Sequence, residues 1–191
     1  MKKIILVAAA ALMAFAANAQ QGKFACVNFE ELVMLMPEMD EARAGIEENS
    51  KQSEEILMAM YEEHQTKVQQ YEQKSASWTG AILEAKQREI MEIEQRIQQT
   101  QQSLQQELQL LQQKLQAPIV EKARKAVADL AKTKGVVAVM ESGAFLYVDP
   151  EQMVDLTEEA RKALNIPEGR TMETLQAEMM AKAQAQQGAQ R

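Results

Sequence analysis

Side chains that could carry out covalent or metal chemistry are few in this chain of 191 residues. His64 is the single histidine and Cys26 the single cysteine, so neither residue has a second of its kind to complete a nucleophile–base pair or a zinc site. We interpret His64 as a seam or surface residue rather than a catalytic group. Cys26 lies in an apolar run and reads as a small core residue, with a reactive thiol or an intermolecular disulfide as the alternative. We therefore predict no enzyme, no bound metal and no cofactor.

Apolar contact is the chemistry that the remaining residues offer. The chain has 13 methionines, and a flexible, polarisable methionine side chain suits contact with varied apolar partners. The candidate contact residues lie near a predicted helical turn and are Met58, Tyr61, Tyr71, Trp78 and Ile82. The sequence leaves two roles open for the aromatic cluster, which either closes the turn or contacts a partner.

Two long helices between Glu38 and Lys134 must position these residues. The stretch is rich in Gln, Glu, Lys, Ala, Leu and Met, which are strong helix formers. In its second half the apolar residues recur at intervals typical of the narrow seam of a coiled coil. The step from Ile97 to Leu108 breaks the heptad, so we expect the seam to change register there. Cap and turn residues at 75–80 predict the tip of an antiparallel hairpin, an arm that comprises residues 38–118.

The chain begins with the pattern of an export signal. Two lysines precede an apolar run from Ile4 to Ala16, which is too short to span a bilayer, and a small-residue cleavage pattern ends at Ala19. We predict that residues 1–19 are a signal peptide cleaved after Ala19. Loss of Lys2 and Lys3 changes the formal net charge from −7 to −9, and such an acidic chain is a poor partner for nucleic acid.

A small body of strands and helices is predicted from residues 20–37 and 119–167. We expect a strand at Phe24–Phe29 and an antiparallel hairpin of Val136–Met140 with Ala144–Val148. Neither hairpin strand alternates apolar with polar residues, so both faces must be covered, and we infer that another copy of the chain covers the second face or a sheet edge. The residues assigned to this oligomerisation body are Phe24, Cys26, Val137, Val139, Phe145 and Tyr147.

The predicted fold is therefore α+β and mainly α, with a small antiparallel β body and a long protruding antiparallel coiled-coil hairpin. Residues 168–191 form a tail that begins as a helix through Met172, Leu175 and Met179. Its Ala- and Gln-rich end is predicted to be partly disordered.

The order of these parts resembles the Skp/OmpH family of periplasmic chaperones. The resemblance runs from Phe24 to about Leu164, and it is carried by Val27-Asn28, the long polar hairpin, Lys134-Gly135, the Val-rich strand and Val154-Asp155-Leu156-Thr157. It implies a jellyfish-like homotrimer with three helical arms around a cavity. It also implies an ATP-independent holdase in the periplasm that binds unfolded outer-membrane β-barrel proteins and prevents their aggregation.

Two points depart from that family. Its members are often basic, whereas this mature chain is acidic, and the tail beyond Glu168 falls outside the resemblance. Contact with a membrane surface stays open, but no integral membrane segment is expected after cleavage. The alternative function is a coiled-coil spacer or adaptor of the cell envelope, which would need a rigid, well-packed seam.

Overall fold

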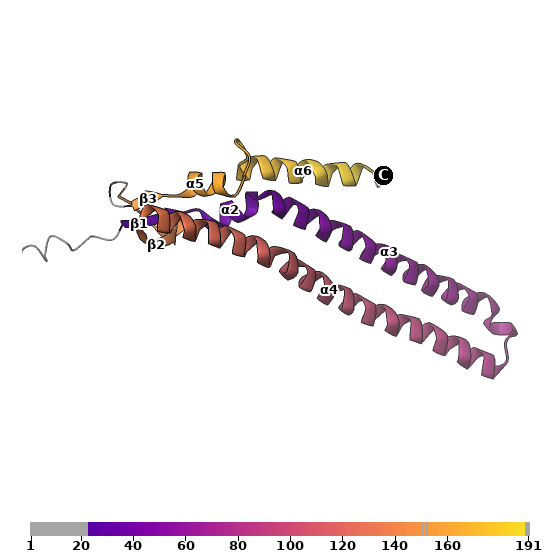
Figure 1. Ribbon diagram of the computed structural model, residues 1–191. Coiled ribbons are helices and arrows are strands. Elements are labelled where there is room, and N and C mark those ends of the chain that lie inside the picture. Colours follow the sequence, from indigo (N-terminus) through magenta and orange to yellow (C-terminus); the bar gives the residue numbers. More distant parts are fainter. Residues whose placement is uncertain (1–22, 150, 152, 190–191) are drawn as a thin grey trace, which may run out of the picture. The chain divides into compact units, whose positions relative to one another are not determined.

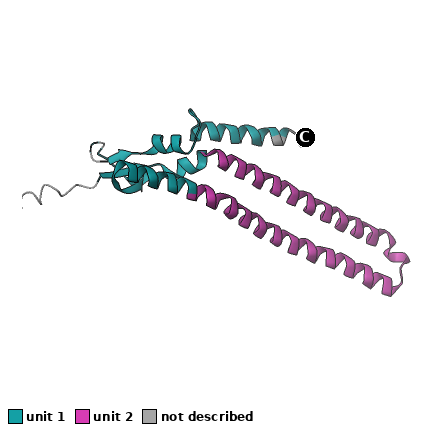
Figure 2. Cartoon of the chain, viewed as in Figure 1, with its two compact units in different colours: residues 1–35, 122–191 teal, residues 36–121 magenta. Residues whose placement is uncertain are grey.

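The computed structural model describes residues 23–149, 151 and 153–189 (Figure 1). The predicted signal peptide, together with residues 20–22 of the predicted body, lies outside the described residues. The chain is mainly helical and divides into two compact units (Figure 2). Unit 1 is made of residues 1–35 and 122–191, and unit 2 of residues 36–121.

Unit 2 is a hairpin of two long helices. Helix α3 spans Pro37–Lys74, a short 3₁₀ turn spans Ser75–Ser77, and helix α4 spans Gly80–Lys134 and continues into unit 1. Pro37 stands at the start of α3, where its fixed φ and missing N–H cost nothing. The 38 residues of α3 extend for about 57 Å at 1.5 Å per residue. The two helices are joined through residues 75–79, where the sequence places the tip, and α4 runs unbroken through Pro118.

The sheet of unit 1 is parallel, so the predicted antiparallel β body is wrong. Strands β1 (Lys23–Val27), β2 (Val136–Glu141) and β3 (Met153–Asp155) are arranged in the order β2-β1-β3, and β1 pairs in parallel with both neighbours. The helices between β1 and β2 form a crossover that returns the chain to the start of the sheet, as parallel pairing requires. Strands without polar alternation are also typical of parallel sheets.

The segment predicted as the second hairpin strand, Ala144–Val148, is not a strand in the chain. A 3₁₀ turn at Ser142–Ala144 follows β2, and the chain then reaches the short strand β3. Because β2 and β3 run in the same direction, the residues between them must travel back from the end of one strand to the beginning of the other. Phe145 and Tyr147 belong to this return segment and not to the sheet.

Three further helices complete unit 1: α2 (Phe29–Leu35), α5 (Thr157–Ala163) and α6 (Met172–Ala189). The core of the unit combines the last three residues of β1 with apolar residues of α2, α5 and the last part of α4. Helix α6 continues to Ala189, through the stretch predicted to be partly disordered, since Ala and Gln are both good helix formers. Its first turn contributes Leu175, which is buried.

Candidate functional site

Polar contacts join the two helices over the outer half of the arm, defined here as residues 61–101. The Gln101 side-chain amide donates a hydrogen bond to the Tyr61 hydroxyl at 2.8 Å. The guanidinium of Arg96 lies 2.9 Å from the carboxylate of Glu63. Because each pair has one partner on α3 and one on α4, these contacts fix the pairing of the helices in that half.

A carboxylate between two lysines lies nearer the tip. Glu89 of α4 forms ion pairs with Lys67 of α3 and, at 2.8 Å, with Lys86 of its own helix. Hydrogen bonds from Lys67 and Lys86 lower the pKa of Glu89 to about 2. The carboxylate therefore stays charged, and the cross-helix pair stays formed, over the whole neutral and mildly acidic range.

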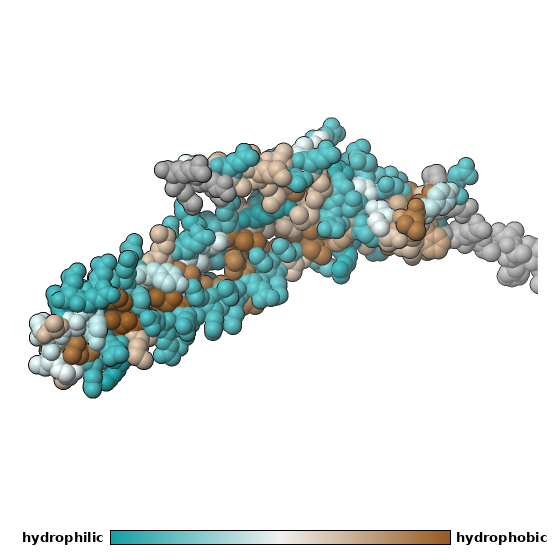
Figure 3. Space-filling view, turned by 180° about the vertical axis from the view of Figure 1, so that it is seen from behind, coloured by the Kyte–Doolittle hydropathy of each residue, from teal (hydrophilic) through white to brown (hydrophobic). Residues whose placement is uncertain are grey.

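The apolar seam is well packed only in part of the arm. Ile93 and Ile97 are buried, whereas Leu104, Leu108 and the later seam leucines of α4 are only half-buried. The change follows the break in the heptad after Ile97, as the spacing predicts. On α3 the inner half carries small and polar residues, which include Gly45, Asn49, Ser50 and Ser53. Figure 3 shows brown apolar atoms between teal polar rows along the arm.

One buried polar atom marks the weakness of this inner half. The Asn49 side-chain oxygen is buried and has no hydrogen-bond partner among the described residues. A buried, unsatisfied oxygen destabilises the packing around it. Met39, Ala42 and Ile119 are buried at the base of the arm, so the weak packing is confined to the part of the inner half around Asn49.

The candidate contact residues separate into two groups. The rings of Tyr71 and Trp78 meet edge to face, with centroids 5.9 Å apart and planes at 66°, and both residues are half-buried. This pair therefore packs across the tip of the hairpin. Met58, Tyr61 and Ile82 are exposed, with 63% of Met58 accessible, so their apolar surfaces are available for contact.

The predicted oligomerisation residues also differ in exposure. Cys26 is buried in β1, while Val139 and Phe145 are half-buried. Apart from the methionines of α6, the large apolar side chains of unit 1 that are exposed come from the three strands and from the return segment. We call this set the exposed apolar cluster; it comprises Phe24, Val137, Leu146, Tyr147 and Val154. Figure 3 shows brown and tan atoms at the end of the molecule that carries the strands.

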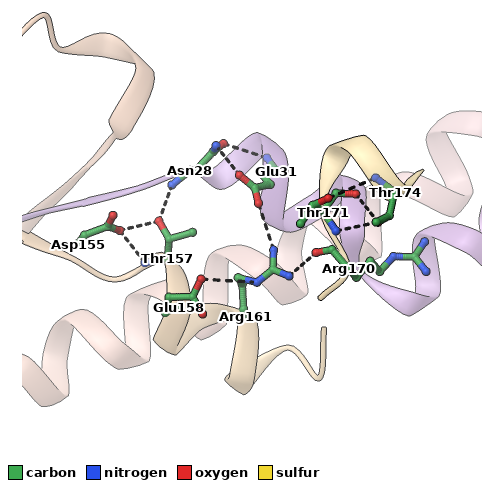
Figure 4. Close-up of polar contacts among 9 residues, drawn as sticks. All are labelled: Asn28, Glu31, Asp155, Thr157, Glu158, Arg161, Arg170, Thr171 and Thr174. Atoms are coloured by element: carbon green, nitrogen blue, oxygen red, sulfur yellow. Dashed lines mark hydrogen bonds and ion pairs between the residues drawn. The ribbon is translucent and has the colours of Figure 1, made fainter. Parts of the chain in front are cut away.

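An arginine cluster that the sequence analysis missed joins α2, α5 and the tail (Figure 4). Arg161 is only 9% exposed, lies 3.1 Å from the Glu31 carboxylate and also donates to the backbone carbonyl of Arg170. Glu158 lies 4.0 Å from the same guanidinium. The sequence analysis assigns no role to Arg161, because no local pattern indicates a partner 130 positions away.

Two motifs that carry the family resemblance, Val27-Asn28 and Val154-Asp155-Leu156-Thr157, lie next to this cluster. The backbone N–H of Asn28 donates to the Thr157 hydroxyl at 3.1 Å, and Thr157 in turn donates to the Asp155 carboxylate at 2.6 Å. Asp155 also accepts the backbone N–H of Thr157, the first residue of α5. The residues Val27-Asn28 and Asp155-Leu156-Thr157 thus hold the ends of β1 and β3 together (Figure 4).

The described residues contain neither a group of three or more metal-ligating side chains nor a helix long and apolar enough to cross a bilayer. Burial, together with the nearby charge of Asp155, raises the pKa of the Cys26 thiol, which lowers its reactivity. An open groove of about 400 Å³ lies between α4 and α5. Its lining residues are Lys122, Lys125, Ala126, Asp129, Leu130, Thr133, Ala163 and Leu164, and they include no nucleophile with a base.

Comparison with known proteins agrees with this arrangement of a small sheet and a helical hairpin. Residues 23–164 match the family described as outer membrane protein, OmpH-like. The chain belongs to the OmpH-like family. The match ends at Leu164, so α6 lies outside the part of this OmpH-like chain that defines the family.

Among solved structures, an OmpH-like protein of Caulobacter crescentus CB15, assigned as an outer membrane chaperone, is similar with a TM-score of 0.66. The two proteins share 13% sequence identity, and the similarity covers 78% of this chain and 86% of the other. At this identity the likeness concerns the fold alone. No curated protein matches the chain.

Proposed function

We propose that this protein is an ATP-independent holdase chaperone of the periplasm that binds unfolded outer-membrane β-barrel proteins and keeps them from aggregating. The observation that carries the proposal is the set of apolar side chains exposed on an otherwise polar helical arm, which includes Met58, Tyr61 and Ile82. Separate, modest apolar contacts can hold many unfolded sequences without selecting one of them. Membership of the OmpH-like family and the name of the Caulobacter crescentus protein support this function.

We also propose that the protein acts as a homotrimer assembled through unit 1. Strands β2 and β3 are both edge strands of a three-stranded sheet, and edges left unpaired are sites for association. The exposed apolar cluster adjoins these strands, and within it Leu146 is fully exposed and Tyr147 is 80% exposed. A neighbouring copy would remove these side chains from water, which favours association.

The loose packing of the arm favours the chaperone function over that of a rigid spacer. A spacer needs a continuous, well-packed seam, whereas Leu104 and Leu108 are half-buried and the oxygen of Asn49 has no partner among the described residues. Such an arm bends and opens more easily, which suits clients of different sizes.

A light-scattering assay tests the proposal. A urea-denatured outer-membrane barrel is diluted into buffer that contains the mature protein, and we expect equimolar trimer to suppress most of the scattering without ATP. The variant M58Q/I82Q, which leaves the contact of Tyr61 with Gln101 in place, should suppress it several-fold less well. The control E54Q/E62Q/E84Q changes three exposed residues of the same arm and keeps its apolar surface, so it should retain the activity. Equal activity of both variants would contradict the proposal.

A further inference from the structure

The groove between α4 and α5 has an apolar floor and a polar edge. The half-buried side chains of Ala126 and Leu130 and the buried side chain of Leu164 line it. The exposed residues Lys125 and Thr133 border the same groove. With a volume of about 400 Å³, the groove has room for apolar side chains of another segment.

The return segment between β2 and β3 carries the two most exposed large apolar side chains of the described residues. Leu146 is fully exposed and Tyr147 is 80% exposed. Glu151 follows them in the same segment and is also exposed. We propose that the return segment of one copy occupies the α4–α5 groove of the next copy in the proposed homotrimer, on which this inference rests.

The symmetry of a trimer requires two different surfaces at each contact. A twofold dimer joins a patch to itself, whereas a closed ring of three joins one patch of each copy to a different patch of the next. Unit 1 has both an exposed apolar segment and an apolar groove. Each copy would use both, so that the ring closes and Leu146 and Tyr147 leave water, which favours association.

The lengths and charges of the two surfaces also match. The groove wall from Lys122 to Thr133 is about 17 Å long, and an extended stretch from Leu146 to Glu151 has about the same length. Lys125 forms no ion pair with another described residue, and neither does Glu151. The segment can therefore lie along the groove with Leu146 on the floor and the carboxylate of Glu151 beside Lys125.

Photo-cross-linking of the full mature chain tests which surfaces meet. The photoreactive residue benzoylphenylalanine replaces Leu146, and these chains are refolded from urea together with isotopically heavy wild-type chains. We expect links from position 146 of a light chain to residues 122–133 or 163–164 of a heavy chain. The same probe at Leu110, an exposed residue of the arm, should not link to the groove.

Native mass spectrometry of the same sample separates this inference from the homotrimer itself. A trimer in which position 146 links only within its own chain, or only to other segments of a neighbour, would overturn the inference and leave the homotrimer standing. A sample without any trimer would overturn both.

An exchange of charges tests the polar contact. K125E and E151K each place like charges opposite one another, so each should raise the protein concentration at which half of the trimer dissociates by about two- to fivefold. The double variant K125E/E151K restores opposite charges and should return close to the wild type. K114E makes the same change at an exposed lysine of α4 outside the groove and should have no comparable effect. A double variant that dissociates at least as readily as the single variants would overturn the inference.

Discussion

The backbone N–H of Asn28 donates a hydrogen bond to the hydroxyl of Thr157, which lies 129 positions further along the chain. Asn28 follows β1 directly, and Thr157 begins α5 directly after β3. This bond therefore connects the end of the first strand of the described chain to the start of α5, which follows the last strand. It makes unit 1 a single body although the whole arm intervenes in the sequence.

Removing the hydroxyl tests this connection. T157A should lower the free energy of unfolding by about 1–2 kcal/mol, because the part-buried N–H of Asn28 loses its acceptor. T157S keeps a hydroxyl at the same position and should stay close to the wild type. Urea unfolding followed by circular dichroism, at one protein concentration, measures both; similar losses in the two variants would contradict the role of the hydroxyl.

Arg161 should be the most sensitive charged residue of unit 1. Because R161M leaves the carboxylate of Glu31 without its partner and frees the carbonyl of Arg170, we expect a loss of about 2–4 kcal/mol. The double variant R161M/E31Q removes the charge left behind and should recover part of that loss. A double-mutant cycle from urea unfolding gives the coupling energy, and a value near zero would show that the pair is not coupled.

Because of the backbone conformation of Gly135, any side chain added at this position should lower the stability of the protein. Its φ is +66°, in the left-handed region, and nothing lies within 4 Å of where a Cβ would stand. G135A should therefore destabilise the protein by about 1 kcal/mol through backbone strain alone. G143A is the matched control, since Gly143 has equal space and no positive φ. Thermal unfolding of the two variants compares them directly; an equal shift in Tm would rule out the conformational explanation.

The arm should loosen in strong acid. The pKa of Glu89 falls from its ordinary value of 4.5 to about 2 because Lys67 and Lys86 bond to the carboxylate. A lowered carboxyl pKa contributes stability above pH 4.5, and this contribution is lost as the pH falls from 4.5 towards 2. Helical circular dichroism of the wild type should decline over this window, and E89Q should have a smaller decline. If E89Q followed the wild-type curve, Glu89 would not be the group responsible.

The helical hairpin could be predicted from sequence because its determinants are local. Helix formers fill both helices of the arm, and turn residues gather at 75–80. The break in the heptad after Ile97 is visible in the spacing of the apolar residues, and the burial of the seam residues falls at the same point. Met58, Tyr61 and Ile82 are exposed and their role as contact residues stays a prediction, whereas Tyr71 and Trp78 pack on each other.

The sheet could not be predicted in the same way, because strand pairing is a long-range property. Val136–Met140 and Ala144–Val148 are both apolar and lie on either side of a turn, so a local reading favours a hairpin. The chain instead pairs β2 with β1 across the arm and places β3, only three residues long, on the other side of β1. The partners of Arg161 could not be predicted from the local sequence either, since Glu31 and Arg170 belong to other segments.

Native mass spectrometry of the mature protein tests the central claim most directly. The protein is measured alone and after a urea-denatured outer-membrane barrel has been diluted into it. The account predicts a trimer that gains the mass of one client, and it predicts that this complex forms without nucleotide. A monomer or dimer whose mass does not change when the client is added would contradict it.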